Sequence, residues 1–372
     1  IGPDPRNFNQ RVSLGRNDLL IRTFHRIGLT EMKGKIIKNC SYLILFITLF
    51  FFYQKNVFSL EIGVSTHIDS YSKEPDYYIN LVKEIGVTSI RNDYWWSQLE
   101  GEKKKFIVSS KLKKSTQLFN NLYDNNLSGL LVLGYGNKLY NNGDYPRTEK
   151  DIDDFLDYIS WVVIRFKGKV KYYEIWNEWY QGTSMEPFSK NKPTDKQYLN
   201  LIKKVRDRIK DLDPAAIVLA GGFNPFDVKQ NKWFSGLIDK GFLKYVDGVA
   251  IHPYSYYRGS KFKSAYLNIS EIDKFYNFYK NKGIDFQIYI TEIGVPNGYL
   301  INSFSEQDSA NFIREYIQLA SKKQYIKGIW FYDLLDDGQN PFNYEHNFGL
   351  FKYDGSMKEV SALMRKNNKS WR

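Results

Sequence analysis

The stretch KVKYYEIWNEWYQG, residues 169–182, joins a strand-like run to a polar end. Its first part has the apolar and aromatic composition of a buried β-strand. The residues responsible are Val170, Tyr172, Tyr173, Ile175 and Trp176. Asn177 and Glu178 follow directly, among further aromatic residues. Because an ionised carboxylate is costly to remove from water without a partner, Glu178 at the end of such a strand indicates a shared polar pocket.

Strand-like runs recur along the whole body of the chain. The runs are 62–68, 87–93, 128–136, 169–178, 216–222, 246–254, 287–294 and 326–334. Amphipathic segments alternate with them, at 75–86, 111–125, 148–167, 194–211, 270–282 and 305–322, with a shorter one at 233–241. This alternation over about 310 residues predicts a single-domain α/β fold, a (β/α)8 TIM barrel. A doubly wound open sheet is the alternative, but no Gly-rich phosphate loop follows the first run.

The first 59 residues differ from the body in charge and hydropathy. They hold nine Lys/Arg and three Asp/Glu, and therefore half of the net charge of +12. The other half is spread without a basic block, which argues against nucleic acid as a partner. After Met32, three lysines precede an uncharged apolar run of twelve residues, Tyr42–Tyr53, and Val57 and Ser59 resemble a small-residue cleavage site. This pattern is typical of a signal peptide, and the run is short for a membrane span.

The sequence therefore predicts three segments. Residues 1–31 are an upstream extension, 32–59 a signal peptide or membrane anchor, and 60–372 the barrel domain. The mature protein would begin near Leu60 and be secreted or periplasmic, and an uncleaved anchor would be its only link to a membrane. The single cysteine, Cys40, precedes the apolar run, so the mature domain would contain no disulfide.

Polar residues occur at the ends of the predicted strands, where a (β/α)8 barrel carries its catalytic groups. They are His67, Arg91, Asn92, Asp93, Asn177, Glu178, His252, Tyr254, Glu292 and Asp333. Glu178 ends the fourth run and Glu292 lies near the end of the seventh. A closed barrel would bring both glutamates to one mouth.

Two carboxylates at one mouth are what the hydrolysis of a glycosidic bond requires. One must donate a proton to the leaving oxygen, and the other must stay ionised to attack or stabilise the sugar. We expect the aromatic residues around Glu178 to raise its pKa by desolvation, and Arg91 to keep Glu292 charged. In a retaining enzyme the two carboxyl groups would lie about 5–5.5 Å apart.

Several motifs together resemble the clan A glycoside hydrolases, which are retaining (β/α)8 enzymes. WNE (176–178) is similar to their acid/base motif, TEIG (291–294) is similar to their nucleophile motif, and HPY (252–254) stands between them. GVTSIRNDYWWSQLE (86–100) and HNFGLFKYDGSMK (346–358) resemble family 39 and family 5 enzymes, including bacterial exopolysaccharide hydrolases. The resemblance covers residues 61–360.

The resemblance implies a role for each residue of these motifs. Glu178 would be the acid/base and Glu292 the nucleophile of a double displacement. Asn177 would bind the sugar 2-hydroxyl, and His252 would support the Glu178 side of the pocket. Arg91 and Tyr254 would orient Glu292 and stabilise its charge. The substrate would be a polysaccharide or oligosaccharide, and no cofactor would be needed.

Three further residues are candidates for contact with the sugar. By the same resemblance, Trp330 would be the stacking platform beneath it. His67 and Trp179 are additional candidates by their positions at strand ends. Many relatives have proline where this chain has Trp179, so the resemblance does not identify the sugar.

Structural roles compete with several of these interpretations. Arg91 could form a core ion pair with Asp93 or Glu100, and His252 could be a structural histidine. Trp330 could pack inside the barrel, and so could the aromatic residues Trp95, Trp96, Trp176 and Trp179. For the chain as a whole, a non-catalytic carbohydrate-binding barrel and a transglycosylase using the same residues remain alternatives.

Other catalytic chemistries fit the sequence less well. The four histidines and one cysteine include no HxH or HExxH spacing, which argues against a metal site. No G-x-S-x-G nucleophile elbow is present, which argues against serine-based hydrolysis.

Overall fold

The computed structural model describes residues 60–183 and 193–367. Within them the chain forms a closed barrel of parallel strands, paired in sequence order, with β8 returning to β1. The strands are β1 (Glu61–Ser65), β2 (Ser89–Trp95), β3 (Ser128–Gly134), β4 (Tyr172–Ile175), β5 (Ile217–Phe223), β6 (Gly248–Ile251), β7 (Ile288–Ile293) and β8 (Ile326–Phe331). The predicted (β/α)8 barrel is confirmed.

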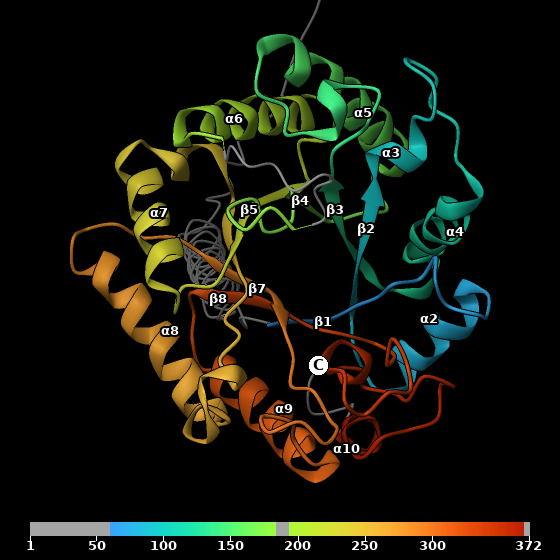
Figure 1. Ribbon diagram of the computed structural model, residues 1–372, viewed down its shortest axis with the longest axis vertical. Helices are drawn as coiled ribbons and strands as arrows, with labels where there is room; N and C mark the ends of the chain where they lie inside the picture. The colour runs from blue at the N-terminus through green and yellow to red at the C-terminus, as the bar shows by residue number, and fades with distance from the viewer. Residues whose placement is uncertain (1–59, 184–192, 368–372) are drawn as a thin grey trace, which may run out of the picture. The chain divides into compact units, whose positions relative to one another are not determined.

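The helices form a ring outside the strands (Figure 1). They are α2 (Pro75–Glu84), α3 (Trp96–Leu99), α4 (Lys113–Asn121), α5 (Glu149–Phe166), α6 (Asp195–Leu212), α7 (Val228–Asp239), α8 (Ala265–Lys280), α9 (Glu306–Ala320) and α10 (Glu359–Asn367). In the part of the chain that the structure describes, no helix is both long and apolar enough to cross a membrane. The predicted segments 1–31 and 32–59 lie outside the described residues.

Several boundaries differ from the sequence prediction because of local capping. Helix α7 begins five residues before the predicted segment, since the Asp227 carboxylate accepts hydrogen bonds from the backbone N–H groups of Lys229 and Gln230. Helix α8 begins at Ala265, where the Ser264 hydroxyl accepts from the N–H of Leu267. These caps start each helix upstream of the residues that carry its apolar periodicity.

The interior of the barrel is filled by side chains from the strands. One buried cluster consists of Leu130, Val132, Tyr172, Leu219, Ala250, Tyr289 and Trp330. The indole of Trp330 lies so close to Gly63 on β1 that an added Cβ there would be 2.1 Å from its Cδ1 atom. A glycine at this position is therefore required by packing, and the barrel below its mouth is a solid core.

Candidate active site

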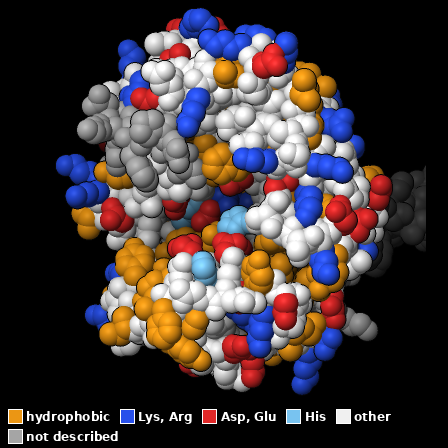
Figure 2. Space-filling view, turned by 45° about the vertical axis from the view of Figure 1, so that its right-hand side comes forward, with side chains coloured by type: hydrophobic (Ala, Val, Ile, Leu, Met, Phe, Trp, Pro, Cys, Tyr) orange, Lys and Arg blue, Asp and Glu red, His pale blue; other side chains and the backbone are white. Residues whose placement is uncertain are grey.

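A cavity of about 580 Å³ opens at the carboxyl end of the barrel. Every strand contributes to it, either from its last residues or from the loop that follows. Figure 2 shows its mouth as a hollow with acidic and histidine side chains inside and hydrophobic side chains along one side. The aromatic residues that line the cavity include Tyr254, Tyr256, Tyr257, Tyr332 and Phe348. The cavity thus has the polar centre and aromatic wall expected of a sugar site.

The chain after β4 has an irregular conformation that points two successive side chains into the cavity. Trp176 and Glu178 have φ values of 66° and 46°, in the left-handed region. In a regular strand Asn177 and Glu178 would face opposite sides, but both line the cavity. Gly222 on β5 makes room for this turn, because a Cβ there would lie 3.0 Å from the Glu178 backbone nitrogen. Such strained backbone at a cavity is typical of functional sites.

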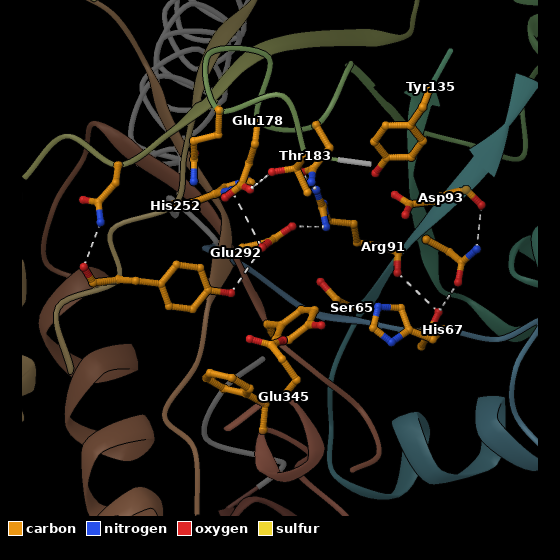
Figure 3. Close-up of a pocket in the computed structure, with 18 of the residues that line it drawn as sticks. Ser65, His67, Arg91, Asp93, Tyr135, Glu178, Thr183, His252, Glu292 and Glu345 are labelled. Carbon is orange, nitrogen blue, oxygen red and sulfur yellow. Dashed lines mark hydrogen bonds and ion pairs between the residues drawn. The ribbon is translucent and has the colours of Figure 1, made fainter. Parts of the chain in front are cut away.

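The two predicted glutamates meet in the cavity. One carboxylate oxygen of Glu178, one of Glu292 and a ring nitrogen of His252 all lie within 4.8 Å of one another. Figure 3 shows the two carboxylates pointing toward each other, Glu178 from the loop after β4 and Glu292 from β7. Their side chains are 15% and 11% exposed, so a ligand can reach both.

Glu292 is held by a cation and a phenol. Arg91 Nη1 lies 2.8 Å from Glu292 Oε1, and the Tyr254 hydroxyl donates to Oε2 at 3.2 Å. Both contacts hold the Glu292 carboxylate in a fixed position. Arg91 therefore pairs with Glu292 as the resemblance implied, and it forms no hydrogen bond with the alternative partners Asp93 and Glu100 among the described residues.

Glu178 is held on both of its oxygens. The Thr183 hydroxyl donates to Oε2 at 2.6 Å, and His252 Nδ1 lies 3.0 Å from Oε1. Burial favours the neutral carboxyl, but the hydrogen bonds and the His252 charge outweigh it and lower the pKa of Glu178. The expectation that aromatic neighbours raise this pKa is therefore wrong for the free protein. Trp176 and Trp179 flank Glu178 in sequence, but neither lines the cavity.

A buried glutamate that the sequence analysis missed organises the floor of the site. Glu174 on β4 is fully buried, accepts from Arg91 Nε at 3.0 Å, and accepts from the Thr291 hydroxyl at 2.9 Å. Burial opposes its ionisation, but Arg91 and His252 lower its pKa. The only sequence signal was a carboxylate inside the apolar run YYEIW.

Glu174 also determines the tautomer of His252. The Thr291 hydroxyl proton is directed at Glu174, so the Thr291 oxygen can only accept from His252 Nε2, 3.1 Å away. Nε2 therefore carries a proton, and Nδ1 faces Glu178. Burial alone would lower the pKa of His252, but the surrounding carboxylates Glu292, Glu174 and Glu178 raise it to about 10.

His67 forms a second acidic cluster at the rim. Its Nδ1 atom lies 2.8 Å from Asp337 Oδ1 and 3.5 Å from Asp333 Oδ2. Burial alone would lower the pKa of His67, but these two carboxylates raise it to about 9. His67 lines the cavity as predicted. By donor type, this cluster and the group of Glu178, His252 and Glu292 are the described residues that could hold a metal ion.

Two of the predicted sugar contacts are wrong. Trp330 is fully buried in the barrel core, with its Nε1 donating to Ser89 Oγ at 3.0 Å. Trp179 is buried against Tyr145, at a ring distance of 4.3 Å. Neither lines the cavity. Trp330 lies in the barrel core, below the residues that line the cavity. Tyr332, two residues further along the chain, lines the cavity instead.

The comparisons with known proteins agree with this architecture. Residues 196–363 match the family model of the glycosyl hydrolase catalytic core. No curated protein matches the sequence. Among solved structures, the chain is similar to a family 39 glycoside hydrolase from Bacteroides cellulosilyticus, with 22% identity, a TM-score of 0.66, and coverage of 83% of this chain and 63% of that one.

Two further solved structures represent other families. One is xylanase 10B from Thermotoga petrophila in complex with xylobiose, with 18% identity, a TM-score of 0.61, and coverage of 84% of this chain and 95% of that one. The other is a GH5_18 protein from Streptomyces cattleya in complex with GlcNAc, with 13% identity, a TM-score of 0.66, and coverage of 84% and 80%. At these identities the neighbours establish the fold alone, and the family match over residues 196–363 agrees with a glycosyl hydrolase catalytic core.

Proposed function

We propose that this chain, whose residues 196–363 match the glycosyl hydrolase catalytic core, is a retaining glycoside hydrolase of polysaccharides or oligosaccharides. The observation that carries the proposal is the pair Glu178 and Glu292, with carboxylate oxygens within 4.8 Å at the bottom of an open cavity. Carboxyl groups about 5–5.5 Å apart serve retention, whereas inverting enzymes keep them about 6.5–9.5 Å apart to admit a water.

Glu292 is the proposed nucleophile. Its contacts with Arg91 and Tyr254 hold the carboxylate in place at the cavity. In the first step it attacks the anomeric carbon, and the bond to the leaving oxygen breaks. In the second step water attacks the glycosyl-enzyme and releases Glu292.

Glu178 is the proposed acid/base, and His252 is its proton partner. Because Nε2 of His252 is committed to Thr291, one proton lies in the bond between Nδ1 and Glu178 Oε1. The pKa directions of the two groups place this proton on His252 in the free protein. A sugar that excludes water from the cavity disfavours the ion pair, and the proton then moves to Glu178, which donates it to the leaving oxygen.

The polar and aromatic walls would orient the sugar. Asn177 Oδ1 accepts from Arg91 Nη2 at 2.9 Å, so its amide NH₂ is the group that can donate to a sugar hydroxyl. Tyr332 replaces Trp330 as the proposed aromatic platform. It packs edge-on against His67, at 5.5 Å, and against Phe348, at 5.3 Å.

Azide rescue of two variants tests the assignment. Glu292→Ala should abolish turnover of aryl glycosides, and azide should restore it with inverted product. Glu178→Ala should lose most activity on poor leaving groups and keep part of it on activated ones, since general acid catalysis contributes about 10²–10⁴-fold. With Glu178→Ala, added azide should give a glycosyl azide that keeps the anomeric configuration of the substrate.

The control is Glu315→Ala, which removes an exposed glutamate from α9. If Glu292→Ala gave the azide with retained configuration and Glu178→Ala gave the inverted one, the roles of the two glutamates would be reversed. Sugar binding by the wild-type protein without any turnover would support a carbohydrate-binding barrel instead.

A further inference from the structure

The cavity contains more carboxylates than cations. Among the described residues that line it, the acidic ones are Asp93, Glu178, Glu292 and Glu345, and the basic ones are Arg91, His67 and His252. This described lining contains no lysine. Each of the three basic side chains is already paired with carboxylates of the protein, as the distances show.

Each nitrogen of Arg91 already contacts an oxygen of the protein, and the side chain is 5% exposed. Its Nε atom binds Glu174 at 3.0 Å, Nη1 binds Glu292 at 2.8 Å, and Nη2 binds Asn177 at 2.9 Å. The charge of Arg91 is therefore shared between two carboxylates of the protein, and little of its side chain is open to a substrate anion.

The two histidines are committed in the same way. His252 is 1% exposed and lies 3.0 Å from Glu178 and 3.7 Å from Glu292. His67 is bonded to Asp337 at 2.8 Å and is also close to the buried Asp333. Even when protonated, each histidine faces at least two carboxylates, so neither presents a net positive charge to the cavity.

Asp93 and Glu345 are two further carboxyl groups of the cavity; burial raises the pKa of both, and the nearby cations Arg91 and His67 only partly oppose this. Among the described residues neither forms an ion pair, and each is bonded to a phenol, Asp93 to Tyr135 and Glu345 to Tyr332. Asp93 lies inside the cavity on β2, and Glu345 is exposed at its mouth on the loop after β8. Figure 3 shows them on different sides of the glutamate pair.

We infer that the cavity accepts glycosyl units without negative charge, which are neutral sugars or sugars with a free amine, and that Asp93 and Glu345 exclude uronates and sulfated sugars. This inference rests on the proposed function, because it concerns the sugar bound at Glu178 and Glu292.

The physical reason is that an anionic sugar would lose water and gain no cation. Burying a charge without a partner is costly, and like charges placed together add to that cost. Hydroxyl and ammonium groups, in contrast, can donate hydrogen bonds to Asp93 and Glu345. The same carboxylates therefore bind one class of substrate and reject the other.

The experiment compares forms of one glycan. A panel of neutral and anionic polysaccharides first identifies a glycan that the protein cleaves. The wild-type protein is then tested on a neutral form of that glycan, on a partly sulfated form, and on a form acetylated to the same degree as a control for bulk. We expect kcat/KM to fall at least about tenfold on sulfation beyond the effect of acetylation.

Two variants locate the effect, and a third controls for net charge. Asp93→Asn and Glu345→Gln should each reduce the discrimination between neutral and sulfated forms. Added salt should weaken the contribution of Glu345 to this discrimination more than that of Asp93, because the Glu345 side chain is exposed and the Asp93 side chain is not. Asp124→Asn removes an exposed charge just before β3, at the other end of the barrel, and should leave the discrimination unchanged.

The outcomes separate this inference from the proposed function. Cleavage of sulfated or uronate-containing glycans as well as neutral ones would overturn the inference and leave the glycosidase proposal intact. Discrimination that persists in both variants would also overturn it. A folded protein that cleaves no glycan of either class would count against the proposed function itself.

Discussion

His252 is the residue on which the proton of the proposed acid depends. In the wild-type protein the proton shared with Glu178 is held by a group whose pKa is raised to about 10. Without the imidazole, a carboxyl group alone would hold it, and carboxyl groups lose their protons at much lower pH. His252→Asn should therefore move the alkaline limb of kcat/KM toward acid and lower the maximum about 10²-fold.

The measurement is the pH dependence of kcat/KM on an aryl glycoside with a poor leaving group. His67→Asn is the matched control, because its pKa is also raised but His67 is bonded to Asp337 and not to Glu178. The control should keep the alkaline limb where the wild-type protein has it. An unchanged limb in His252→Asn would show that His252 is not the proton partner.

Trp330 and Tyr332 give a second contrast between neighbouring residues. Trp330→Phe should destabilise the barrel by about 1–3 kcal/mol, because it removes buried volume and the hydrogen bond to Ser89. Its KM should stay at the wild-type value. Tyr332→Ala should instead raise KM about tenfold, since it removes the proposed platform. Urea unfolding and steady-state kinetics measure the two effects, and a raised KM in Trp330→Phe would restore the original interpretation.

The sequence could predict which residues end the strands, but not how deep each one lies. Glu178, Glu292, Arg91, His252 and Tyr254 were accessible to prediction because motif and strand end coincide. The depth of Trp330 depends on the stagger of the strands around the barrel, which a single strand does not reveal. Loop residues were less accessible still, because Thr183 and Glu345 reach the cavity only through the folds of their loops.

At the scale of elements, the loop between β8 and α10 carries Tyr332, Glu345 and Phe348 to the cavity. One buried ion pair anchors this loop: Lys358 Nζ lies 2.7 Å from Asp336 Oδ1 and 3.0 Å from Asn297 Oδ1 on the loop after β7. Lys358 is 4% exposed. The loop after β7 and the loop after β8 are therefore joined to each other.

Breaking this pair should affect both stability and binding. Lys358→Met leaves Asp336 buried without its cation, which typically costs about 3–5 kcal/mol. The variant Lys358→Met with Asp336→Asn should recover part of the loss, since no unpaired charge remains. Urea midpoints of the two variants measure the difference, and KM should rise in both. Equal stability of the single and double variants would mean that the unpaired charge is not the cause.

Helix boundaries show the same limit of sequence reasoning at this scale. The apolar periodicity of α7 and α8 predicted that both helices exist. It did not predict where they begin, because Asp227 and Ser264 act through one or two hydrogen bonds to backbone groups. A cap is visible in a sequence only when the following residues are already known to be helical.

At the scale of the whole molecule, half of the net charge belongs to residues 1–59. We propose that residues 32–59 direct export, and strand β1 begins at Glu61, directly after the predicted cleavage site. Expression of residues 32–372 in a bacterial host should give an extracytoplasmic protein whose N-terminal sequence begins near Leu60. An intact N-terminus in the membrane fraction would indicate an anchor, and an intact N-terminus in the cytosol would contradict export.

The buried titratable groups predict the pH dependence of stability. A histidine whose pKa is raised on folding stabilises the fold below its unfolded pKa, and that stability is lost as the pH rises through the folded value. For His67 and His252 the folded values are about 9 and about 10. Burial also raises the pKa of Asp333, so this group favours stability at low pH as well. Glu174 and Glu178 have lowered pKa values, and their contribution is lost only as the pH falls below the ordinary carboxyl range.

These signs place maximal stability on the acid side of neutrality, between about pH 5 and 7. The melting temperature should change little between pH 5 and 6.5, fall as the pH rises from about 6.5, and level off near pH 10, once the folded histidines have also lost their protons. In His67→Gln the maximum should be lower and the fall between about pH 6.5 and 9 shallower, because one of the two titrating ion pairs is gone. Thermal unfolding followed by circular dichroism from pH 4 to 10.5 measures both curves. A wild-type melting temperature that stays constant up to pH 10.5 would mean that neither histidine forms its ion pair in solution.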